Sequence, residues 1–375
     1  RQLDTEQLIK TAKHYQVRGQ HEDALRTYQD AQAIDTKCSE SLHEHGMIHF
    51  RSGEISMAIT LLKEATKYDD RRADFYNNLG TILKTSGDLD AAEKAFRKAL
   101  ILDRNLVPAL VNIGSLLLDR LQVAAALKAL NRAVDLAPEN STALSTYAEA
   151  KKMSGDVVEA LSLQLKAAET NPFADFVWLN LANTHMDLEQ WDESYLAVKK
   201  SIIISPHLSE SWNNLGFIKI NYGEYLSAER YFTQALIIRN NFAPSYSGLA
   251  EVNYLQNQLD DALKFSAIAI QFSPESPHHY KSRRALQLLA KGSMKDGWEL
   301  KEARLCLDHS IDHRGRPPRW DGQSLTDKTL LITAEEGIGD EVFYASCFND
   351  VINSTKPVSY THLRAHETRH DLVCR

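Results

Sequence analysis

The chain has 375 residues, of which 43% are hydrophobic and 25% are charged, and its formal net charge is −7. This composition excludes a wholly disordered chain, and the scattered acidic residues create no field that favours nucleic acid or an anionic membrane. No apolar run approaches the ~18 residues of a transmembrane helix. Four separate cysteines argue against a disulfide framework and favour a reducing, cytoplasmic location. The first residue is Arg1, which leaves room for a missing start and a lost signal peptide.

A 34-residue repeat organises residues 5–276. Counted from Thr5 as position 1, the same residue classes return eight times without an insertion, and positions 8, 20 and 27 are always small. The residues at position 8 are Ala12, Gly46, Gly80, Gly114, Ala148, Ala182, Gly216 and Ala250. Small side chains at fixed spacing allow two helices to approach closely, whereas large residues at positions 4, 7 and 24 fill the space between them. The pattern therefore predicts eight helix–turn–helix units.

These repeats closely resemble the tetratricopeptide family, whose period is 34 residues. The resemblance is carried by the small positions, by Trp178 and Trp212 at position 4, and by Pro138, Pro172, Pro206 and Pro274 at position 32. The usual turn glycine of position 15 is replaced by Leu121, Glu189 and Asn257. The resemblance implies an all-α, right-handed superhelix whose first helices line a concave groove. It also implies that the partner is a protein or an extended peptide.

Asparagine recurs at position 6 in four repeats, as Asn78, Asn112, Asn180 and Asn214. Because their spacing is a multiple of 34, we expect the four side chains to point the same way along the groove. This region resembles the repeats of O-linked N-acetylglucosamine transferases, in which such a ladder grips a peptide backbone. An amide suits that role because it both donates and accepts hydrogen bonds. The alternative is that the asparagines bond locally, and Lys10, Glu44, Thr146 and Gly248 interrupt the ladder.

The repeat phase weakens after residue 276. Aligned without an insertion, Arg283 and Arg284 stand where the repeat requires a large apolar residue and a small one. We therefore expect residues 277–327 to form divergent capping helices and a linker. Cys306, His309 and His313 have no fourth ligand near them, so we expect no metal site there.

Residues 328–356 have the pattern of a different domain. A short apolar run at 329–334 precedes a loop with Gly337, Gly339 and Asp340, and apolar residues at helical spacing follow. This order predicts a buried strand, a loop able to present N–H groups to an anion, and a helix. We therefore expect the first βα unit of a truncated α/β domain.

Together with residues 297–304 and 320–322, this stretch resembles the junction of bacterial tetratricopeptide proteins that carry a glycosyltransferase-like domain. That domain is similar to heptosyltransferases and, more distantly, to O-linked N-acetylglucosamine transferases. The resemblance implies that Asp340 is a candidate general base and that Gly337 and Gly339 belong to the active-site loop. The alternative for Asp340 is a helix N-cap. A nucleotide-sugar is implied only for a full-length protein, so we expect this chain to hold no cofactor and to be inactive.

The final residues raise the question of a zinc protease, because residues 366–370 read His-Glu-Thr-Arg-His, which matches H-E-x-x-H. However, residues 358–368 resemble one reading frame of a common sequencing adapter, and residues 372–375 resemble its primer site. We therefore expect residues 357–375 to be a non-native tail that binds no metal.

The sequence as a whole predicts a protein- or peptide-binding scaffold that, in a full-length protein, presents a substrate or partner to a glycosyltransferase-like domain. The alternative function is a pure protein–protein interaction adaptor without a catalytic role.

Overall fold

The computed structural model describes residues 2–274, 277–301 and 303, and every regular element within them is a helix. The helices are α1 (Gln2–Val17), α2 (His21–Ile34), α3 (Ser39–Arg51), α4 (Ile55–Tyr68), α5 (Ala73–Thr85), α6 (Leu89–Leu102), α7 (Val107–Asp119), α8 (Val123–Leu136), α9 (Ser141–Met153), α10 (Val157–Thr170), α11 (Asp175–Asp187), α12 (Trp191–Ile204), α13 (Ser209–Asn221), α14 (Tyr225–Ile238), α15 (Ala243–Leu255), α16 (Leu259–Gln271), α17 (His278–Ala290) and α18 (Met294–Lys301).

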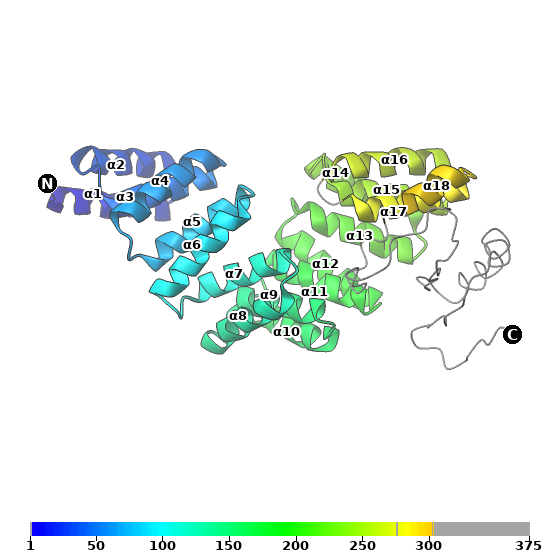
Figure 1. Ribbon diagram of the computed structural model, residues 1–375, viewed down its shortest axis with the longest axis horizontal. Coiled ribbons are helices and arrows are strands. Elements are labelled where there is room, and N and C mark those ends of the chain that lie inside the picture. Colours follow the sequence, from blue (N-terminus) through cyan, green and yellow to red (C-terminus); the bar gives the residue numbers. More distant parts are fainter. Residues whose placement is uncertain (1, 275–276, 302, 304–375) are drawn as a thin grey trace, which may run out of the picture. The chain divides into compact units, whose positions relative to one another are not determined.

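Consecutive helices form hairpins, and each hairpin packs against the next (Figure 1). In the third repeat, for example, α5 occupies positions 1–13 and α6 occupies positions 17–30. The same division holds in the repeats from α3 through α14. The predicted all-α repeat is therefore confirmed. The predicted strand at 329–334 lies outside the described residues.

The two helices of a repeat meet at the small residues that define the period. The residues at positions 20 and 27 are fully buried in all eight repeats. At position 8, a methyl group added to Gly80 would lie 2.6 Å from the ring of Phe96, and one added to Gly114 would lie 2.5 Å from Leu130. Phe96 and Leu130 both stand at position 24. Close helix approach in these repeats therefore depends on having no side chain at position 8.

The turn between the helices needs a left-handed backbone at position 15. Glycine supplies it at Gly87 (φ 88°) and Gly155 (φ 92°), at no steric cost. Leu121, however, adopts the same conformation with φ 58° and is 56% exposed, so little burial offsets its backbone strain. The geometry of the hairpin therefore overrides the preference of the residue.

Helices α17 and α18 form a ninth hairpin that packs against α16. Its phase is displaced by one residue, because α17 begins at His278 where an uninterrupted register would place position 1 at residue 277. With that shift, the fully buried Ala285 stands at position 8, and Gly292 (φ 89°) takes the turn. Gly297 stands at position 20, where an added methyl group would lie 2.7 Å from Leu289. The repeat thus continues beyond the point where its sequence phase weakens.

The second repeat carries a buried histidine at position 7, where four other repeats have leucine. His45 is only 7% exposed. Burial, with a smaller contribution from the neighbouring His49, lowers the pKa of His45 to about 4. The neutral imidazole is therefore the form that packs in this core.

A first prediction concerns the close contact of Gly80 with Phe96. Gly80→Ala should destabilise the chain by about 1–3 kcal/mol through overpacking, although alanine is the better helix former by about 1 kcal/mol. In the sixth repeat Ala182 faces Val198 at the same positions, so the loss should shrink when Phe96→Val is also present. Urea unfolding of both single variants and the double variant measures the coupling. Simple additivity would show that the two positions do not compete for space.

A second prediction concerns acid stability. His45 has a folded pKa of about 4, below the ordinary value of about 6.5 for an unfolded chain. The neutral form stabilises the fold fully above about pH 6.5, and this contribution is lost as the pH falls toward 4. His45→Leu should therefore reduce the acid-induced loss of unfolding free energy by on the order of 2 kcal/mol. Urea midpoints of both proteins at pH 7.5 and pH 4.5 test this, and an unchanged pH difference would refute it.

Candidate functional site

The four ladder asparagines lie on the first helices α5, α7, α11 and α13, and each is half-buried. Each amide nitrogen donates a hydrogen bond to the first helix of the preceding repeat. The acceptors are His43 Nε2 for Asn78 (2.9 Å), Asn77 Oδ1 for Asn112 (3.0 Å), Ser145 Oγ for Asn180 (3.0 Å) and Asn183 Oδ1 for Asn214 (2.5 Å). These partners stand 31 or 35 residues earlier, at position 9 or 5. The donor half of each amide therefore joins neighbouring repeats.

The acceptor half of the ladder is largely unused. Among the described residues, the side-chain oxygens of Asn112, Asn180 and Asn214 receive no hydrogen bond. Asn78 differs, because its oxygen accepts from Asn77 at 3.3 Å. The ladder thus combines an inter-repeat contact with amide oxygens that remain able to accept from a ligand.

The structure shows what surrounds the residues that interrupt the ladder. A methyl group at Gly248 would lie 2.3 Å from the Phe232 ring, so this ring excludes any side chain at position 6 of the eighth repeat. The Thr146 hydroxyl turns back to the carbonyl of Thr142 at 2.9 Å. In the displaced ninth hairpin, position 6 is Arg283.

At the N-terminal end of the ladder, a histidine and a carboxylate take the place of the amides. His43 is buried and stacks on Phe75 with ring centroids 4.2 Å apart and an interplanar angle of 10°. Because Asn78 donates to Nε2 of His43, the neutral ring donates from Nδ1 to Glu44 at 3.2 Å. This hydrogen bond lowers the pKa of Glu44 and outweighs the effect of its burial. Position 6 of the second repeat therefore carries a negative charge.

A second histidine cluster lies on the same helix, α3. The Nε2 atoms of His45 and His49 are 2.9 Å apart, and Nδ1 of His49 lies 2.7 Å from the Glu54 carboxylate. Nδ1 of His45 contacts Gln32 on α2. Sequence analysis did not identify this cluster, although a histidine at the apolar position 7 was a visible signal.

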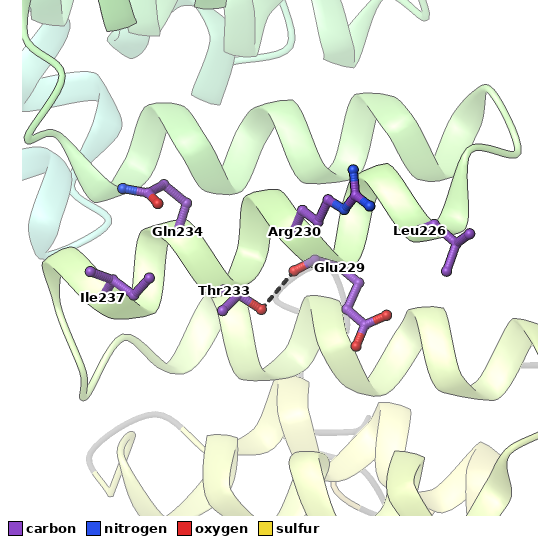
Figure 2. A pocket seen from close by; sticks show the side chains of 6 residues that line it. All are labelled: Leu226, Glu229, Arg230, Thr233, Gln234 and Ile237. Atoms are coloured by element: carbon purple, nitrogen blue, oxygen red, sulfur yellow. Dashed lines mark hydrogen bonds between the residues drawn. The ribbon is translucent and has the colours of Figure 1, made fainter.

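A shallow surface hollow lies along α14 and is lined by this helix alone. Figure 2 shows its lining side chains, which all belong to this one helix: Leu226, Glu229, Arg230, Thr233, Gln234 and Ile237. The hydroxyl of Thr233 bonds to the carbonyl of Glu229 at 2.8 Å, within the helix. Since Leu226 and Ile237 are 71% and 73% exposed, this is an open helix face. It encloses no ligand site.

The remaining predicted site residues lie outside the part of the chain that the structure describes. Gly337, Gly339 and Asp340 are outside the described residues, as is the histidine-rich tail at 357–375. Within the described part of the chain, no three His, Cys, Asp or Glu side chains are grouped to hold a metal ion. No helix in that part combines the length and apolar character needed to cross a membrane.

The comparison with curated proteins finds a bacterial relative of similar sequence. Over 188 residues, or 49% of this chain, the sequence is 30% identical to the protein FlbA of Caulobacter vibrioides. The matched region covers 32% of that relative, so this chain spans about a third of its length.

Two solved structures share the fold at low sequence identity. A chain of the APC/C hetero-tetramer Cut9–Hcn1 superposes with a TM-score of 0.60 at 16% identity, covering 77% of this chain and 57% of that one. A tetratricopeptide repeat protein from Parabacteroides merdae superposes with a TM-score of 0.56 at 17% identity, covering 67% and 99%. Residues 43–106 and 111–175 match the tetratricopeptide repeat family model. The two matched segments therefore contain tetratricopeptide repeats, which form a scaffold of the kind that binds other proteins.

Proposed function

We propose that the asparagine ladder binds an extended segment of a partner protein through the partner's backbone N–H groups. The observation that carries the proposal is the set of unused amide oxygens on Asn112, Asn180 and Asn214, which lie on the first helices α7, α11 and α13. Such oxygens accept from any backbone N–H, whatever the side chain, so they favour broad recognition of extended chains. Because the amide N–H groups already hold neighbouring repeats, the oxygens are oriented before a ligand binds. Pre-orientation reduces the entropy lost on binding.

The partner's segment would supply backbone N–H donors to the unused amide oxygens. Each amide nitrogen already donates one hydrogen bond within the repeats, or two in Asn112, so fewer of its N–H groups are left for a ligand than in an isolated asparagine. A segment whose backbone N–H groups are free fits this surface, and an extended strand or loop satisfies that condition. A helix does so only at its first turn, since its remaining N–H groups are bonded internally.

In a longer protein, we propose, the ladder presents such a segment to a glycosyltransferase-like domain that includes Gly337, Gly339 and Asp340. This part of the proposal is supported by the sequence resemblance of residues 328–356. A nucleotide-sugar would be the donor and Asp340 the base toward the acceptor hydroxyl. The second candidate function is an adaptor without catalysis, which is favoured by the large share of the chain given to repeats.

A third prediction tests the ladder. Changing Asn112, Asn180 and Asn214 together to alanine should weaken retention of unstructured peptides on a mixed-sequence peptide array at least tenfold. The same variant should lose some stability, about 1 kcal/mol for each inter-repeat hydrogen bond. The measurements are peptide retention and the urea midpoint of the same samples.

The control for this prediction separates binding from stacking. Ser145→Ala removes the acceptor for the N–H of Asn180 but leaves the asparagine oxygen, and Ser145 is only 1% exposed. This variant should lose stability and still retain peptides. If it loses peptide binding as severely as the asparagine variant, the ladder acts by holding the repeats together.

A fourth prediction distinguishes the two candidate functions. An uninterrupted genomic read through the codon for Thr355 should continue into alternating strands and helices with a second lobe suited to a nucleotide-sugar. A stop codon soon after that position would favour the adaptor.

A further inference from the structure

We propose that His45 and His49 form a two-histidine site for a divalent transition-metal ion, with Glu54 and Gln32 as outer partners. The proposal is independent of peptide binding by the ladder. It rests on the positions of the ring nitrogens and on what each ring bonds on its other side.

The two histidines are four residues apart on α3, so they lie on one face of the helix. Their Nε2 atoms are 2.9 Å apart, and the ring centroids are 4.7 Å apart with a 35° tilt. Zinc binds imidazole nitrogen at about 2.0–2.1 Å, so two ligands of one ion are roughly 2.9 Å apart at a right angle and 3.4 Å apart in a tetrahedron. The observed separation is at the lower end of that range. Small ring rotations would direct both lone pairs at one ion.

The outer partners complete an arrangement that is common around metal-bound histidines. A metal ligand nitrogen is usually opposed by an N–H that donates to a carboxylate or carbonyl. Nδ1 of His49 lies 2.7 Å from Oε2 of Glu54 and meets this requirement directly. Nδ1 of His45 lies 3.0 Å from Nε2 and 3.3 Å from Oε1 of Gln32. Both amide atoms are within reach, so Gln32 can serve either tautomer of His45.

Without a metal, one proton must lie between the two facing nitrogens. Glu54 fixes the neutral His49 ring with its proton on Nδ1, so His49 accepts at Nε2 and His45 donates there. When a metal ion binds, the His45 proton moves from Nε2 to Nδ1, and Gln32 turns its carbonyl oxygen to accept it. The pair then supplies two lone pairs without a net loss of a proton.

Packing alone does not call for a histidine pair at this place. Position 7 is leucine in Leu79, Leu181, Leu215 and Leu249, and the first helices that contain them span the same positions 1–13 as α3 does. The sixth repeat provides an internal comparison, because His185 stands at the position of His49 and bonds Gln190 at 2.7 Å. There, however, Leu181 replaces the second imidazole. A histidine at position 11 thus serves the hairpin turn, while His45 adds the second ligand.

The site has two protein ligands, because among the described residues no three His, Cys, Asp or Glu side chains are placed to hold one metal ion. Water must fill the remaining coordination positions. The His49 side chain is 16% exposed, which places solvent beside the proposed ion. Imidazole favours zinc, copper and nickel over calcium or magnesium. The site is therefore expected to bind more weakly than a closed site of four protein ligands.

The test is equilibrium dialysis of the full chain against Zn²⁺ alone at pH 7.5. His49→Gln and His45→Leu should each reduce the bound zinc by one equivalent, or weaken that equivalent at least tenfold. His45→Leu restores the residue of other repeats, so it guards against a variant that fails to fold. His185→Gln is the matched control and should bind as the wild type does. Histidines in the tail contribute equally to every sample, so they cancel in the comparison.

A second measurement shows whether the zinc equivalent that the variants lose was bound to the folded protein. Zn²⁺ at saturation should raise the urea midpoint of the wild type and of His185→Gln, because an ion that binds only the folded state stabilises it. In His49→Gln and His45→Leu this increase should shrink. Equal zinc binding and equal midpoint shifts in all four proteins would overturn the proposal.

Discussion

The contact between position 8 of the first helix and position 24 of the second helix governs how each repeat packs. Where position 8 is glycine, position 24 is Leu62, Phe96, Leu130 or Phe232, and these large side chains lie against the bare backbone. Where position 8 is alanine in the sixth and eighth repeats, position 24 is the smaller Val198 or Ser266. The first and fifth repeats, however, combine alanine at position 8 with the buried Tyr28 and Gln164 at position 24, so the volume that the two positions share differs between repeats. Because protein interiors are close-packed, the two helices of a hairpin must fit the residues at both positions in each repeat.

Stacking between hairpins uses polar side chains as well as apolar ones. The ladder amides reach back to the preceding first helix, and the indole N–H groups of Trp178 and Trp212 donate to the carbonyls of Pro172 and Pro206 at 2.8 and 2.9 Å. Both kinds of bond recur because the repeat places the same atoms in the same relation each time. A ligand therefore meets amides whose donors are partly used in stacking, which favours partners that bring their own N–H groups.

The parts of this fold that were predictable from sequence are those fixed by residues within one repeat. Small residues at three positions revealed the eight hairpins, because their spacing alone determines which faces meet. The ninth hairpin was obscured by a single displaced residue, which moved Arg284 onto the position that Ala285 takes in the structure. Sequence phase is sensitive to such a shift, whereas the packing of α17 against α16 is kept. The repeated hairpins were thus easier to predict from sequence than the residue at which they end.

The roles of the ladder residues depended on partners in another repeat, so sequence spacing could not assign them. Whether Asn112 bonds to residue 77, to residue 81 or to a ligand depends on how neighbouring first helices cross. Likewise, Gly248 interrupts the ladder because of Phe232 in the preceding repeat, a relation that no pattern within one repeat contains. The unused oxygens of Asn112, Asn180 and Asn214 are therefore a property of the stacked hairpins.

The histidine pair shows the opposite case, in which a departure from the repeat is itself informative. A buried imidazole without a partner costs free energy, and leucine fills position 7 in four repeats without needing one. At His45 the chain also carries Gln32, His49 and Glu54, which together satisfy both rings. A repeat that needed only a packed core would have no use for this connected set. In a repeat protein, an apolar residue is enough to fill such a core position. Specific chemistry is therefore best inferred where a set of mutually bonded polar residues takes its place.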